Sequence, residues 1–141
     1  MFLKSVIDPA TRQAYLETHY CVHGDPPMTL HVGVANEPLT AFYKAMQTNC
    51  CAFITACNPY SQKLEDSDNA ERHQALAHEL NQLGLKLIES TGQHPSNLWP
   101  VEVGFLVWGL SMEESMKLGT RHEQNAIIWC GTWSPLLPLG V

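Results

Sequence analysis

The chain has 141 residues, of which 45% are hydrophobic and 16% are charged, and its formal net charge is −6. This composition excludes intrinsic disorder, which needs low hydrophobicity and high charge, and a membrane span, which needs about 18 consecutive apolar residues. The excess of acidic residues disfavours nonspecific binding to nucleic acid or to an anionic membrane surface. Asp8-Pro9 interrupts the apolar N-terminal stretch too early for a signal peptide, so we expect one globular domain over residues 1–141 in the cytoplasm.

Hydrophobic periodicity and capping residues predict helices and strands in the order α-β-β-α-β-α-β-β-α-β. The elements are a helix from Pro9 to about Glu17, strands at 18–23 and 28–34, a helix from Asn36 through Met46, a strand at 51–56, a helix between Asp68 and Gly84, strands at 85–89 and 104–110, a helix from Ser111 to near Gly119, and a strand at 125–130. Hairpin-like neighbours mix with β-α-β crossovers. We therefore expect an α+β fold with a mixed β-sheet of about five to six strands covered by helices.

The polar residues that follow the strand CAFITA form the most informative part of the sequence. On the helix that begins near Asp68, the leucines of one face give way to Asn69 and Arg72 toward the N-terminus. Polar groups that face inward need partners, and Arg is seldom buried without an anion. Asn58 and Ser61 lie near the same helix start, where free N–H groups and the helix dipole favour an anion. This combination indicates a cleft. The alternative is that Asn58 and Ser61 only form a turn and that Arg72 pairs with Asp68.

Two polar residues of the C-terminal third extend the predicted cleft. Glu102 precedes the apolar strand GFLVWGL, and Gln124 stands at the entry to the strand AIIWC. Glu102 is a candidate general base or partner of Arg72, and the alternative is a solvated residue at a strand start. We therefore predict a cleft that binds a small anionic or nucleotide-like ligand, with Arg72 holding a phosphate or carboxylate. The predicted lining consists of Asn58, Ser61, Asn69, Arg72, Glu102 and Gln124.

Metal and cofactor sites are not predicted. His19, Cys21 and His23 alternate along one face of a predicted strand and carry donor atoms that suit zinc, but the sequence offers no evident fourth ligand. The five cysteines are an odd number without a CxxC motif, which favours free thiols, most of them buried. No P-loop, GxGxxG, GxSxG or EF-hand pattern occurs, so we predict no cofactor. The sequence does not decide whether the protein is an enzyme.

A non-enzymatic interaction module is the alternative function. Its partner surface would consist of Trp99, Trp133, Leu136 and Leu137, which lie in Pro-rich segments. A second copy of the chain is one candidate partner for this surface. The competing interpretation is that these apolar side chains cover the sheet, because apolar tails usually dock onto their own domain.

A nuclease is a third hypothesis, and it would need an acidic cluster that binds metal. Glu65, Asp66 and Asp68 lie close together in the sequence. Acidic residues are expected at a helix start for reasons of the helix dipole alone. We therefore do not expect a nucleic-acid partner.

Several of these segments together resemble a known family. The stretches AYLETHYCV, FITACNPYS, WPVEVGFLVWGL and LGTRHEQNAIIW, with Asn69 and Arg72 at a helix start, are similar to the bacterial family called domain of unknown function 3293. The resemblance covers roughly Ala14 to Trp129. It implies a small stand-alone bacterial cytosolic protein without an assigned activity. The family tends to carry a basic residue after the tyrosine of the first stretch, where this chain has Cys21, so a site lined by that residue would be altered here.

Overall fold

The computed structural model describes residues 9–24, 27–32, 43–96, 100–131 and 137–140. Its elements are α1 (Pro9–Glu17), β1 (His19–Val22), β2 (Met28–Leu30), β3 (Cys50–Ile54), a short 3-10 helix η1 (Pro59–Ser61), α3 (Asp66–Gln82), β4 (Lys86–Gln93), β5 (Glu102–Trp108), α4 (Met112–Arg121), β6 (Ala126–Gly131) and β7 (Leu137–Gly140). The predicted element order is confirmed for these parts of the chain. Most of the predicted helix at 36–46 lies outside the described residues. Its last part, residues 43–46, is described and is helical. The sequence did not predict β7.

The strands form one sheet in the order β2-β1-β4-β5-β3-β6-β7, which confirms the α+β class. Every pairing between these strands is antiparallel, and the described residues form seven of them, whereas the sequence predicted a mixed sheet of about five to six strands. The physical reason lies in the crossovers. The connection through α3 joins β3 to β4, which run in the same direction, but β5 lies between them and is antiparallel to both. The connection through α4 likewise joins β5 to β6 with β3 between them.

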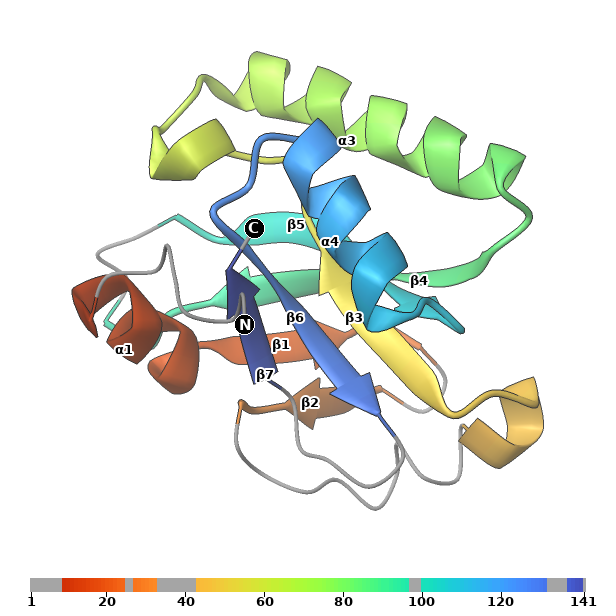
Figure 1. Cartoon of the computed structure of the whole chain (residues 1–141). Coiled ribbons are helices and arrows are strands. Elements are labelled where there is room, and N and C mark those ends of the chain that lie inside the picture. The colour runs from red at the N-terminus through yellow and green to blue at the C-terminus, as the bar shows by residue number, and fades with distance from the viewer. Residues whose placement is uncertain (1–8, 25–26, 33–42, 97–99, 132–136, 141) are drawn as a thin grey trace.

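Both faces of the sheet are covered by apolar side chains. Helices α3 and α4 lie on one face, whereas α1 lies at one end of the sheet, away from α3 (Figure 1). Along β3, Cys51 and Phe53 belong to the core on one face, and Ala52 and Ile54 belong to the core under α3 and α4. Burial on both faces explains why this strand is a continuous apolar run instead of an alternating one. None of the helices in the described part of the chain is long and apolar enough to cross a membrane.

Gly104 allows β3 and β5 to approach each other closely. A Cβ atom at this position would lie 2.5 Å from the backbone oxygen of Ile54 and 2.9 Å from the ring of Phe53. Either contact would force the strand or the ring to move. The glycine therefore leaves the space that the Phe53 ring occupies, and that ring lines the cavity described below.

The cysteines behave as the sequence predicts. All five are free: Cys51, Cys57 and Cys130 are buried, and Cys21 and Cys50 are half-buried. Cys51 lies directly opposite Cys130 in the pairing of β3 with β6. The Tyr43 hydroxyl donates to the backbone oxygen of Cys130 at 3.1 Å, so this group of side chains is part of the core.

A half-buried histidine makes the stability of the fold depend on pH. His73 on α3 stacks on Phe105 with ring centroids 4.5 Å apart, and its Nδ1 is buried with no hydrogen-bond partner in the part of the chain that the structure describes. Burial lowers the pKa of His73 below its ordinary value, and the charge of Glu89 offsets part of this effect. The unfolded chain therefore binds a proton more readily at this residue than the folded chain does.

We predict that the free energy of unfolding falls as pH decreases through the ordinary histidine pKa, near 6.5 in model peptides, because the proton stabilises the unfolded state. A His73→Gln variant should show a smaller loss over the same range in urea unfolding. The same substitution at His78, an exposed histidine on α3, is the control and should keep the wild-type profile. Equal pH profiles for wild type and His73→Gln would contradict the prediction.

Candidate functional site

The chain adopts an unusual backbone conformation directly after β3. Asn58, Tyr60 and Ser61 have φ angles of 48°, 51° and 61°, in the left-handed region that favours glycine. Asn tolerates this region better than most residues, but here it also precedes Pro59, and a residue before proline normally avoids helical conformations. Conformations of this kind cost about 1–3 kcal/mol each and persist only where the surrounding structure fixes them.

The side chain of Asn58 supplies that fixation. It is 4% exposed, and its Oδ1 accepts from the backbone N of Leu64 at 3.0 Å and from Nδ2 of Asn69 at 2.9 Å. The backbone N of Asn58 donates to Oδ1 of Asn69 at 2.9 Å, so the two asparagines bind each other twice. The Nδ2 of Asn58 donates to Oε2 of Glu102 at 2.7 Å. The turn after β3 is thereby joined to α3 and to the start of β5.

Arg72 forms a second tie between distant segments. Its Nε donates to the backbone oxygen of Ala56, one terminal nitrogen donates to the backbone oxygen of His122 at 2.7 Å, and the other pairs with Glu123 at 3.2 Å. These bonds join the end of β3 to the loop between α4 and β6. The carboxylate that pairs with Arg72 is therefore Glu123, where the turn-only alternative had named Asp68.

Gln124 strengthens the same connection. Its Nε2 donates to the backbone oxygens of Cys57 and His122, each at 3.1 Å, and the residue is 9% exposed. Beside it, Nδ2 of Asn125 donates to the Ser61 hydroxyl at 2.9 Å. The loop before β6 is thus held against the turn after β3 by side chains from both.

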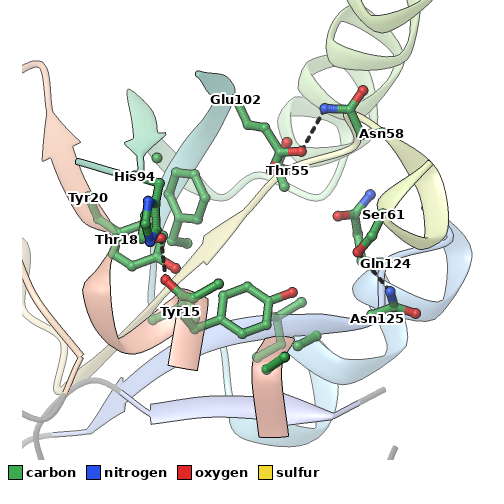
Figure 2. Close-up of a pocket in the computed structure, with 17 residues that line it drawn as sticks. Tyr15, Thr18, Tyr20, Thr55, Asn58, Ser61, His94, Glu102, Gln124 and Asn125 are labelled. Atoms are coloured by element: carbon green, nitrogen blue, oxygen red, sulfur yellow. Dashed lines mark hydrogen bonds between the residues drawn. The ribbon is translucent and has the colours of Figure 1, made fainter. Parts of the chain in front are cut away.

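These ties border a cavity of about 320 Å³, which we call the Glu102 pocket (Figure 2). The pocket lies between α1, the sheet and the turn after β3. Its small and apolar lining consists of Ala10, Ala14, Phe53, Gly92, Ala126, Ile127 and Ile128. Its polar lining consists of Tyr15, Thr18, Tyr20, Thr55, Asn58, Ser61, His94, Glu102, Gln124 and Asn125. A mostly apolar wall with convergent polar groups is typical of small-ligand sites.

Four of the six residues predicted from the sequence line the pocket, namely Asn58, Ser61, Glu102 and Gln124. Asn69 and Arg72 are outside the described lining and support it from behind through the bonds given above. Sequence analysis missed the wall formed by α1 and β1. The signal that could have found it is the spacing of Ala10 and Ala14, four residues apart on one helix face beside Tyr15, which leaves room for a ligand against the sheet.

Burial is the main influence on the ionisation of the two tyrosines in the pocket, and the charge of Glu102 adds to it. Burial raises the pKa of Tyr15 to about 12, and the negative charge of Glu102 raises it as well. Burial, together with the charges of Tyr15 and Glu102, also raises the pKa of Tyr20. Both phenols are therefore neutral at physiological pH and can act as hydrogen-bond donors.

His94 holds one side of the pocket in place. Its Nε2 lies 2.8 Å from Oε1 of Glu17, and its Nδ1 lies 2.6 Å from the Ser96 hydroxyl. The bond to His94 lowers the pKa of Glu17. The pair connects the end of α1 to the end of β4, so the wall formed by α1 is attached to the sheet at this point.

The structure does not bring His19, Cys21 and His23 together as a metal-binding cluster. In the described ranges, no group of three His, Cys, Asp or Glu side chains is placed to hold a metal ion. His23 contacts Thr91 at 3.1 Å, and the His19 ring lies against His31 with centroids 4.7 Å apart. The expectation that the protein carries no zinc stays a prediction. Of the proposed partner surface, Trp99, Trp133 and Leu136 lie outside the described residues, and Leu137 begins β7.

A comparison of the sequence with models of known protein families identifies the family of this chain. Residues 54–127, a little more than half of the chain, match the family model described as "Protein of unknown function (DUF3293)". The chain belongs to this family. Searches of curated proteins and of solved structures found no match. The DUF3293 match begins at the last residue of β3 and ends within β6, so it includes all six predicted site residues. The wall formed by α1 and β1, which contains the stretch AYLETHYCV, precedes it.

We predict that Asn58→Gly destabilises this DUF3293 protein although glycine suits the backbone at this position. The loss should be about 1–3 kcal/mol, because Glu102 and Asn69 lose buried hydrogen bonds. Asn58→Ala should be less stable still, since it adds backbone strain. The control is Gln47→Gly at another residue of positive φ, 55°, which is exposed. Chemical unfolding measures all three, and wild-type stability for Asn58→Gly would show that the side-chain bonds are unimportant.

Proposed function

We propose that the protein binds a small molecule in the Glu102 pocket. The volume of about 320 Å³ is at the lower end of the range for ligand sites, which is about 300–1,000 Å³. Polar groups from the turn after β3, from β5 and from the loop before β6 converge on one side of this space. The small side chains of Ala10 and Ala14 leave the other side open to a ring or an alkyl chain.

The observation that carries this proposal is the concentration of backbone strain beside the pocket. Among the described residues, five that are not glycine have positive φ, and Asn58, Tyr60, Ser61 and Glu123 are four of them. Tyr60 and Glu123 are bonded directly, with the backbone N of Tyr60 donating to the backbone oxygen of Glu123 at 2.6 Å. Strain of this kind clusters at ligand sites, where it aims particular side chains. Here it positions Asn58 and Ser61, which both line the pocket.

The anionic ligand expected from the sequence loses its main support. That expectation relied on Arg72, whose guanidinium donates to two backbone oxygens and pairs with Glu123. Of the nucleotide-like ligand we keep the base and drop the phosphate. A planar ring with polar edges suits a pocket that combines aromatic, amide and carboxylate groups.

The cellular setting is part of the same proposal. We place the protein in the cytoplasm, where thiols are kept reduced, and the five free cysteines support this location. A second copy of the chain remains the alternative partner, through the tryptophan and leucine residues named in the sequence analysis.

A fragment screen by ligand-observed NMR tests the proposal. We expect wild-type protein to bind ring-containing fragments and Ala14→Phe to bind them at least about tenfold more weakly, because the added ring occupies the pocket. Ala75→Phe is the matched control, since it places the same ring on an exposed position of α3 away from the pocket. No bound fragment, or equal affinities for the two variants, would contradict small-molecule binding at this site.

A further inference from the structure

The charge and hydrogen-bonding pattern of the Glu102 pocket indicate the chemical class of its ligand. We propose that the ligand is a planar ring that presents adjacent N–H donors to Glu102, as an amidinium group or the amino edge of a guanine-like base does. This inference rests on the proposed function, because it assumes that the pocket binds a small molecule.

The first support is the position of Glu102. This residue begins β5, is half-buried and lines the pocket, and it is the only acidic side chain among the described residues of the lining. The bond from Asn58 fixes one carboxylate oxygen at 2.7 Å. A carboxylate accepts about four hydrogen bonds and suits two parallel N–H donors in particular. Figure 2 shows the Glu102 side chain reaching toward Asn58 on the same side of the cavity as Thr55.

The second support is the direction in which neighbouring polar groups are already used. Both hydrogens of the Gln124 amide donate to backbone oxygens, so only its oxygen can serve a ligand. The Thr55 hydroxyl donates to the backbone oxygen of Val103 at 2.7 Å and accepts from the backbone N of Cys57 at 3.1 Å, so one acceptor lone pair remains for a ligand. The pocket therefore offers acceptors on this side, and a ligand that supplies donors is complementary to it.

The third support is aromatic surface close to the carboxylate. Tyr20 and Phe53 contact each other with ring centroids 5.0 Å apart, and both line the pocket. The Tyr15 ring extends into the same space (Figure 2). Aromatic faces attract the positive edge of N–H groups and stack with planar rings. A negative group beside aromatic rings favours a ring with N–H donors and repels an anion.

Three ligands of one shape separate these possibilities. Benzamidine carries two N–H donor groups and a positive charge, benzamide is neutral, and benzoate is anionic. We expect wild-type protein to bind benzamidine at least about tenfold more tightly than benzoate by calorimetry, with benzamide between them. Glu102→Gln keeps the shape of the side chain and can still accept from Asn58, so it should remain folded and lose most of the preference.

The outcomes distinguish this inference from the proposed function. If all three ligands bind wild-type protein equally and Ala14→Phe weakens each of them, the pocket binds small molecules and the inference about N–H donors is wrong. Tighter binding of benzoate than of benzamidine would overturn the inference in the same way, without any use of the Glu102 variant. If no ligand binds at millimolar concentration, or if Ala14→Phe binds all three as wild type does, both the inference and the proposed function are overturned.

Discussion

The side-chain amide of Asn58 is the interaction on which the candidate site depends. It joins its own loop to two other elements, because it bonds to Leu64 within the loop, to Asn69 on α3 and to Glu102, 44 residues away at the start of β5. The same bonds hold the backbone in a left-handed conformation before a proline. The cost of that conformation and the benefit of the buried hydrogen bonds are therefore linked. A side chain without both a donor and an acceptor could not replace Asn58 here.

Arg72 and Gln124 extend this arrangement to the loop before β6. Both donate to the backbone oxygen of His122, and they reach Ala56 and Cys57 at the end of β3. Buried backbone oxygens at a strand end need donors, which these side chains supply. The polar stripe of α3 is thus a support for the pocket wall, and the chemistry that faces the pocket comes from its neighbours on the strands and loops.

Sequence analysis predicted the helices and strands well, because their apolar periodicity and capping residues are local features. The Ser111 and Glu114 capping box, for example, is present at the start of α4. The order of the strands in the sheet could not be predicted, because no local sequence pattern indicates that β5 lies between β3 and β4. The role of Arg72 was misjudged for a related reason. The cation on the inward-facing stripe does have partners, as expected, but Arg72 is half-buried and its partners are backbone oxygens and Glu123 from a distant loop.

A double-mutant cycle measures whether Asn58 and Glu102 act as one unit. The free energy of unfolding is measured for wild type, Asn58→Gly, Glu102→Ala and the double variant. A hydrogen bond to a charged group is worth about 1.5–3 kcal/mol, so we expect a coupling free energy in this range. Single effects that add to within about 0.5 kcal/mol would contradict it, because two residues that do not interact show additive effects.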